Sequence, residues 1–98
     1  MRLRSVIAAL LFSLSIAAPA YATIANVGGG TWNYGHELEG LWGKHDWSNY
    51  VHPTLYHSST AICASQNVKH YAVAGTWTDV SIHCNWWDSD AWYWNTYS

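Results

Sequence analysis

The chain has few positive charges, and this scarcity excludes two classes of function. Its 98 residues contain four Lys and Arg residues against six Asp and Glu residues. Arg2 and Arg4 precede an apolar N-terminal segment, so the remainder of the chain keeps only Lys44 and Lys69. Two lysines cannot neutralise enough phosphates for nucleic-acid binding, and they cannot attract a protein to anionic lipid in bulk. We therefore expect no nucleic-acid partner and no general membrane disruption.

Long apolar runs are also absent, apart from one short run near the N-terminus. Residues 6–18 are almost wholly apolar, but a run of 13 residues is too short to span a bilayer as a helix. Arg2 and Arg4 precede the run, Pro19 ends it, and Ala20 and Ala22 supply an A-x-A cleavage site. We expect a secretory signal peptide at residues 1–22 and a secreted domain at residues 23–98, without transmembrane insertion. The alternative is a buried N-terminal helix.

Cysteine is scarce, with Cys63 and Cys84 as the two examples in the chain. An exported pair of cysteines is by default a disulfide, which here closes a loop of about 20 residues and contributes roughly 3 kcal/mol. The competing interpretation is a reactive thiol near His70 or His83.

Residues 23–98 carry two lysines and six acidic residues, a balance of −4, and all eight tryptophans. Low charge and high aromatic content argue against disorder.

Residues 23–98 lack an apolar repeat of 3.6 residues, whereas β-branched and aromatic residues are common. This pattern predicts an all-β fold, a small antiparallel β-sandwich of two sheets. We expect a two-residue turn at Gln66 and Asn67. Residues 36–47 form either a long loop or a hairpin around Gly40 and Gly43. The expected strands cover residues 31–34, 48–51, 58–65, 68–74, 76–86 and 91–97.

The segment 76–86 shows the clearest alternation of the chain. Thr78, Val80, Ile82 and Cys84 occupy one face of the expected strand, and this face looks inward over its second half. Cys84 therefore points into the core, where a bridge to Cys63 would join two strands.

Four segments carry a resemblance to a known family. GGGTWNYG, SNYVHPTLYHSSTA, AGTW and DAWYWNTY, at residues 28–35, 48–61, 74–77 and 90–97, resemble in sequence and order the lactococcin 972 family of bacteriocins. The resemblance implies a β-sandwich of two antiparallel sheets. It also implies antibacterial activity without pore formation, through the cell-wall precursor lipid II and blocked septum formation. Residues 36–47 are longer than the family pattern, and the cysteine pair is not universal in the family.

Within these segments we expect a binding site formed by Trp32, Tyr50, His52 and His57. The histidines would donate hydrogen bonds to a phosphate-bearing headgroup, and the alternative is that they are ordinary surface or turn histidines. We expect no metal and no cofactor, because no H-E-x-x-H or tight Cys/His cluster occurs. Asp88 and Asp90 are expected in a solvated turn, with a calcium site or an acid/base pair as alternatives. We see no catalytic motif and expect no enzyme.

The expected partner is lipid II or another cell-wall component of target bacteria. A second hypothesis is a non-lethal carbohydrate or cell-wall binding module that uses exposed tryptophans, and a third is a secreted structural or adhesion domain. Among Trp86, Trp87, Trp92 and Trp94 some rings must be exposed, because aromatics occupy both faces of their strands. Unpaired strand edges allow a homodimer. A bacteriocin also implies immunity or export proteins in the producing cell.

Overall fold

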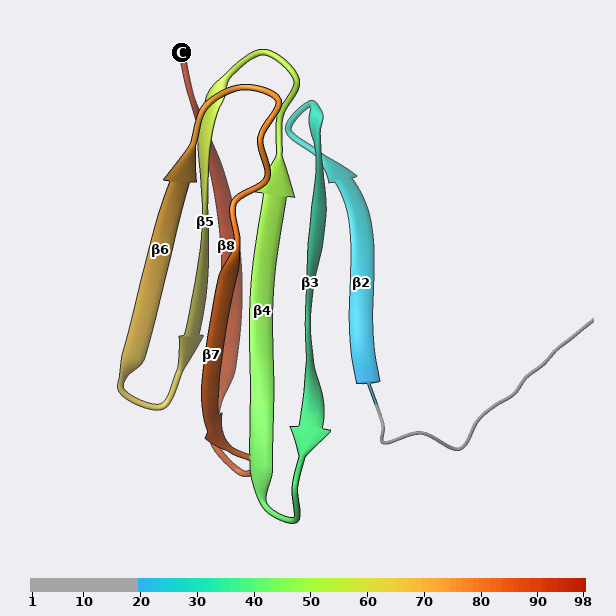
Figure 1. Cartoon of the computed structure of the whole chain (residues 1–98), viewed down its shortest axis with the longest axis vertical. Helices are drawn as coiled ribbons and strands as arrows, with labels where there is room; N and C mark the ends of the chain where they lie inside the picture. Colours follow the sequence, from blue (N-terminus) through green and yellow to red (C-terminus); the bar gives the residue numbers. More distant parts are fainter. Residues whose placement is uncertain (1–19) are drawn as a thin grey trace, which may run out of the picture.

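A computed structural model describes residues 20–98 as two antiparallel sheets (Figure 1). The four-stranded sheet has the order β2-β3-β4-β7, with β2 (Ala20–Val27), β3 (Gly30–Glu39), β4 (Gly43–Val51) and β7 (Val80–Asn85). The three-stranded sheet has the order β6-β5-β8, with β5 (Tyr56–Cys63), β6 (Gln66–Ala72) and β8 (Asp90–Tyr97). The predicted all-β fold of two antiparallel sheets is confirmed.

The two sheets pack face to face, and β5 of the smaller sheet contacts both β4 and β7 of the larger one. In Figure 1, β8 lies behind β7 and β5 lies between β6 and β7, while β6 and β2 are on opposite sides. Strand β4 shows why the layers form, because its buried residues alternate with partly exposed ones along the whole strand. Among residues 20–98, no helix has the length and apolar character needed to cross a membrane.

The apolar core is small and lies at the end of the sandwich that holds the disulfide. Its fully or nearly fully buried members are Ala61, Cys63, Val80 and Ile82. Elsewhere the layers are joined by buried hydroxyl groups. Ser59 Oγ donates to the carbonyl oxygen of Ser48 at 2.5 Å, and the Tyr50 amide donates to Thr78 Oγ1 at 2.8 Å. Buried polar groups of this kind stabilise a fold only when they are paired.

The segment 36–47 forms a hairpin, the second of the two predicted alternatives. Strands β3 and β4 pair in antiparallel register from Thr31 opposite Val51 to Glu39 opposite Gly43. The predicted turn at Gln66 and Asn67 is wrong. Cys63 pairs with Gln66, so the tight turn consists of Ala64 and Ser65, and Ala64 has a φ of 56°.

The expected strand 76–86 is shorter than predicted, because β7 begins at Val80. Residues before it follow a turn in which the Thr76 amide donates to the carbonyl oxygen of Val73 at 3.1 Å. The prediction of which face points inward is confirmed, since Thr78, Val80 and Ile82 are buried. Residues 1–19 lie outside the described part, and with them most of the predicted signal peptide. Strand β2 begins at Ala20, before the predicted cleavage point after Ala22.

Candidate functional site at the glycine end of the sandwich

A two-residue glycine turn joins β2 to β3 at one end of the sandwich. Val27 pairs with Gly30, and the turn residues Gly28 and Gly29 have φ values of 61° and 87°. These values match a type I′ hairpin turn, which favours glycine. Both glycines also touch the protein beneath them. A Cβ atom on Gly28 would lie 2.3 Å from Cζ3 of Trp94, and one on Gly29 would lie 2.9 Å from Nε2 of His52.

Trp32 and Tyr50 lie opposite each other on β3 and β4. The Tyr50 side chain is fully buried, and its hydroxyl donates to the carbonyl oxygen of Val27 at 2.7 Å. Its ring stacks on Trp94 at 5.3 Å between centroids. Burial raises the pKa of the Tyr50 hydroxyl above its ordinary value. Trp32 is partly buried and donates from Nε1 to Ser48 Oγ at 3.0 Å. Tyr50 therefore supports the glycine turn from below.

His52 is buried and holds the chain that follows it. Its Nδ1 accepts hydrogen bonds from the amides of Thr54 and Leu55, at 3.1 and 3.0 Å. Because Nδ1 is an acceptor, the proton of the neutral ring lies on Nε2, the nitrogen that faces Gly29. The carbonyl oxygen of His52 accepts from the Gly75 amide at 2.8 Å. His52 thus joins three segments of this end of the molecule.

His57 is fully buried beside Tyr50, at 5.6 Å between ring centroids. Its Nδ1 lies 2.8 Å from the carbonyl oxygen of Leu55, and its Nε2 lies 2.7 Å from that of Thr76. Both ring nitrogens thus face backbone carbonyl oxygens. His57 therefore connects the start of β5 to the segment that precedes β7.

A hollow of about 660 Å³ lies at this end of the sandwich, beside the β2–β3 turn. Its lining is mostly backbone and small side chains, contributed by Asn26, Gly29, Gly30, Thr31, Val51, Pro53 and Gly75. The four segments quoted in the sequence analysis converge here, three in the lining and the fourth through Trp94 beneath Gly28. Trp32, Tyr50, His52 and His57 do not line the hollow themselves. Tyr50 and His52 lie against the glycine turn and His57 lies beside Tyr50, and a binding role for the four residues stays a prediction. Tyr50, His52 and His57 form its support, whereas Asn26 and Thr31, which sequence reasoning missed, line it.

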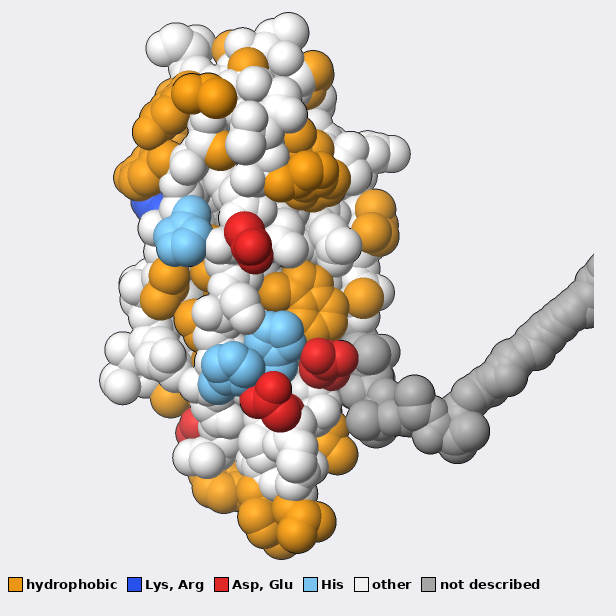
Figure 2. Space-filling view, in the orientation of Figure 1, with side chains coloured by type: hydrophobic (Ala, Val, Ile, Leu, Met, Phe, Trp, Pro, Cys, Tyr) orange, Lys and Arg blue, Asp and Glu red, His pale blue; other side chains and the backbone are white. Residues whose placement is uncertain are grey.

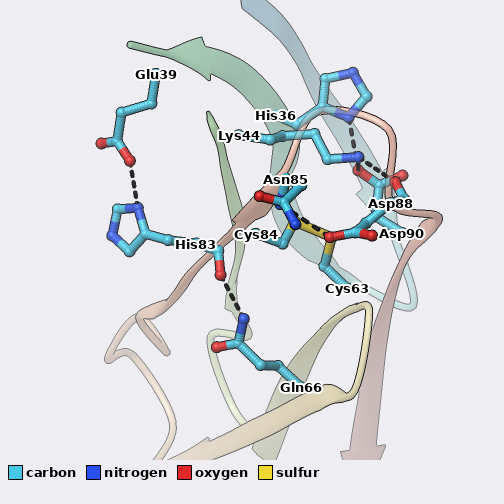
Figure 3. The surroundings of a disulfide bond; sticks show 10 residues. All are labelled: His36, Glu39, Lys44, Cys63, Gln66, His83, Cys84, Asn85, Asp88 and Asp90. Atoms are coloured by element: carbon cyan, nitrogen blue, oxygen red, sulfur yellow. Dashed lines mark hydrogen bonds and ion pairs between the residues drawn. A yellow bond between two sulfur atoms is a disulfide. The ribbon is translucent and has the colours of Figure 1, made fainter. Parts of the chain in front are cut away.

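The opposite end holds the disulfide and a buried group of charges (Figure 3). Cys63 and Cys84 are bonded, with Cα atoms 6.3 Å apart, which confirms the predicted pairing. Asp90 is not in a solvated turn, as the sequence suggested. It is the first residue of β8 and bonds His36 Nδ1 at 2.9 Å and Lys44 Nζ at 3.0 Å. The D-x-D spacing gave no hint that Asp90 would meet a lysine on β4.

Asp46 lies on the same buried face as Lys44 and has no hydrogen-bond partner in good geometry among the described residues. Burial raises the pKa of Asp46 to about 7, and the neighbouring Asp90 adds to the rise. Burial alone would also raise the pKa of Asp90, but Asp46, His36 and Lys44 outweigh burial and hold it below its ordinary value. Atoms of His36, Asp46 and Asp90 lie within 4.8 Å of one another, but the Lys44 ammonium already supplies positive charge there.

Histidine and carboxylate side chains gather on the outer face of the four-stranded sheet (Figure 2). His45 and His83 pair across β4 and β7 and stack at 4.9 Å between ring centroids. His45 Nδ1 lies 3.0 Å from Glu37 Oε2, and His83 Nδ1 lies 2.6 Å from Glu39 Oε1. This cluster depends on strand register, so no spacing within one strand revealed it.

Exposed aromatic side chains are numerous. Of the four tryptophans among which exposed rings were predicted, two are exposed and two are partly buried. Trp87 is 68% exposed and Trp86 lies at the surface, whereas Trp92 and Trp94 are partly buried between the sheets. The prediction that some of these rings are exposed is confirmed. Trp42 in the β3–β4 turn and Trp77 are exposed as well.

The fold and the disulfide define a small all-β domain of two antiparallel sheets. A family model described as Bacteriocin (Lactococcin_972) matches residues 28–94. The chain belongs to this bacteriocin family, which supports a secreted, bacteriocin-like function and is not an enzyme class. Comparisons with curated proteins and with solved structures find no significant match.

Proposed function

We propose that the protein is a secreted bacteriocin that inhibits the growth of related bacteria by binding lipid II. Binding would block septum and cell-wall synthesis without pore formation. The observation that carries the proposal is the convergence of the four family-like segments on one hollow, supported by His52 and Tyr50. The stability of the fold explains why these side chains are buried, but it does not explain why a hollow lined by small residues lies beside them.

The hollow would take the polar headgroup of the precursor. Small residues let a ligand approach the backbone closely, and Asn26 and Thr31 offer an amide and a hydroxyl group. Neither lysine lines the hollow, since Lys44 is buried at the disulfide end and Lys69 lies on β6. Recognition would therefore rest on uncharged donors. Trp32, Tyr50, His52 and His57, expected from the sequence to bind directly, would act mainly by positioning the turn and its lining.

The test is a titration of the exported, oxidised protein against lipid II in detergent micelles, followed by tryptophan fluorescence. Undecaprenyl phosphate in the same micelles serves as the control for lipid and phosphate. We expect saturable binding to lipid II alone. Asn26→Ala should weaken it, whereas Asn85→Ala, a matched change of an exposed residue at the other end of the sandwich, should not. Binding of equal strength to both lipids would remove lipid II as the receptor.

A non-lethal wall-binding module is the second candidate, favoured by the exposed rings of Trp42 and Trp87. It predicts retention on cell walls without inhibition of growth. Under the bacteriocin proposal, the producing cell also supplies immunity or export proteins. The open edges of both sheets would allow a homodimer.

A further inference from the structure

The outer face of the three-stranded sheet carries a trough that runs along its central strand. Ser58, Thr60 and Ile62 on β5 form its floor, and the trough has a volume of about 350 Å³. Ser58 and Thr60 are shorter than their neighbours on β6 and β8, Tyr71 and Asn95 for the one and Lys69 and Tyr93 for the other, which explains the depression. From Ser58 to Ile62 the floor extends about 13 Å at the usual rise of a strand.

The walls of the trough carry polar groups at regular intervals. Asn67 and Lys69 stand on β6, and Tyr93 and Asn95 stand on β8. Thr60 pairs with Lys69 on one side and with Tyr93 on the other, so the three side chains cross the trough at its centre. Tyr93 is 54% exposed. The trough therefore presents an aromatic ring, two amides and an ammonium group around a floor of hydroxyls.

One hydroxyl on the floor is available to a ligand. Thr60 is 6% exposed and lines the trough, yet it makes no side-chain hydrogen bond with any other residue in the part of the chain that the structure describes. By contrast, Ser58 Oγ lies 3.0 Å from the Tyr97 hydroxyl. The buried side-chain atoms without a partner in the described residues do not include the Thr60 hydroxyl, so this group reaches the surface of the trough, where water or a ligand can bond it.

Three tyrosines extend the trough at the Ser58 end. The ring centroids of Tyr56, Tyr71 and Tyr97 lie 5.8 to 5.9 Å from one another, and Tyr56 stacks nearly parallel to Tyr71. Tyr56 and Tyr71 are about half exposed, and Lys69 Nζ lies 5.7 Å from the Tyr71 ring centroid. Exposed rings gathered around polar groups mark a binding surface.

The charge of this face differs from that of the rest of the domain. The six acidic residues lie on β3 and β4, in the connections before β7 and β8, and at the inward-facing start of β8. Among residues 20–98, Lys69 is the one Lys, Arg, Asp or Glu on the outer face of β6-β5-β8. An anionic ligand can therefore approach this face of an otherwise acidic protein.

We propose that the trough binds an amino-sugar glycan that carries carboxylates, as an uncrosslinked strand of the bacterial wall does. The tyrosine rings stack on the apolar faces of the sugar rings, and Thr60, Asn67 and Asn95 bind hydroxyl and acetamido groups. Lys69 pairs with a carboxylate. The trough and the hollow are lined by different residues, so substitutions can address each site separately.

Sedimentation with purified, detergent-extracted peptidoglycan sacculi, which contain no lipid II, tests the proposal. We expect the exported protein to sediment with the sacculi. Tyr93→Ala, Thr60→Val and Lys69→Gln should each weaken retention by about three- to tenfold, the range for one stacked ring or one hydrogen bond. Trp77→Ala removes an aromatic ring of similar exposure, 48% against 54% for Tyr93, from the segment before β7 and should retain wild-type affinity. A thermal melt of each variant verifies that it is folded.

Three outcomes would overturn the proposal: no sedimentation of the wild-type protein, undiminished retention of all three folded variants, or equal loss with Trp77→Ala. Analytical ultracentrifugation adds a fourth. If the wild-type protein is a dimer and Tyr93→Ala converts it to a monomer, the face is an interface between two copies of the chain. Lipid II titration of the same variants separates the two sites. Loss of sacculus binding with intact lipid II binding supports the trough, and a failed lipid II titration leaves the sedimentation result standing.

Discussion

The six-membered ring of Trp94 lies directly against Gly28, so that a Cβ atom on the glycine would stand 2.3 Å from Cζ3. This contact ties the β2–β3 turn of one sheet to β8 of the other. It also explains why the turn and the aromatic C-terminal strand occur together in one sequence pattern, although 65 positions separate the two residues.

Gly28→Ala should therefore destabilise the fold by roughly 2–4 kcal/mol, through steric overlap with Trp94 and through its positive φ. Gly40→Ala is the matched control, because Gly40 has a φ of 68° and nothing within 4 Å of a Cβ atom. That variant should lose about 1 kcal/mol. Urea unfolding of both proteins measures the difference, and equal losses would show that the contact with Trp94 relaxes freely.

The buried carboxyl of Asp46 should make stability depend on pH. Its pKa rises from 3.8 to about 7 on folding, so between these values the native state binds more protons than the unfolded chain. The free energy of unfolding therefore falls as pH rises from about 4 to about 7. The lowered pKa of Asp90 acts in the opposite sense and removes stability as pH falls below its ordinary value of 3.8. The two effects place maximal stability at mildly acidic pH.

Asp46→Asn removes the titrating group and keeps its shape. We expect this variant to be more stable than the wild type by roughly 2–4 kcal/mol at about pH 8, and nearly equal to it at about pH 4. Urea unfolding at the two pH values measures the change. A stability difference that does not vary with pH would mean that folding leaves the pKa of Asp46 unchanged.

Replacing both cysteines by alanine should lower the free energy of unfolding by about 3 kcal/mol, because the bridge spans 21 positions of sequence. The loss should match that of the wild-type protein unfolded in the presence of a thiol reductant. An unchanged urea midpoint in both cases would indicate that the buried polar contacts between the layers suffice.

Binding at the hollow should depend weakly on salt, since neither lysine lines it. We expect lipid II affinity to change by less than about threefold between roughly 50 and 500 mM salt. Sacculus binding by the trough should weaken more steeply, because Lys69 takes part. A strong salt dependence at the hollow would point to a cationic contact that the lining does not contain.

The fold was predictable because strand alternation and glycine punctuation are local signals. The inward direction of Val80, Ile82 and Cys84 followed from alternation alone, and with it the disulfide. The turn at Ala64 and Ser65 was missed because Ala64 adopts a positive φ, which is unusual for alanine and which the sequence therefore does not indicate. Tertiary pairing of Cys63 with Gln66 decides that turn.

The candidate site was only partly predictable. Tyr50, His52 and His57 were predicted to bind a ligand, and this stays a prediction; sequence could not show that their polar atoms are engaged inside the protein. Asn26 and Thr31 reach the hollow through the pairing of β2 with β3, which composition does not encode. The trough likewise depends on which strands flank β5.

The Cys63–Cys84 bond distinguishes the reduced protein before export from the oxidised protein after export. Thiols stay reduced in the bacterial cytoplasm and are oxidised after export. A newly made chain inside the producing cell consequently holds its two layers together by side-chain packing and hydrogen bonds without the covalent bond, and it is more exposed to proteolysis. The bridge closes after export, so that oxidation gives the durable form to the exported molecule and withholds it from the cell that made it.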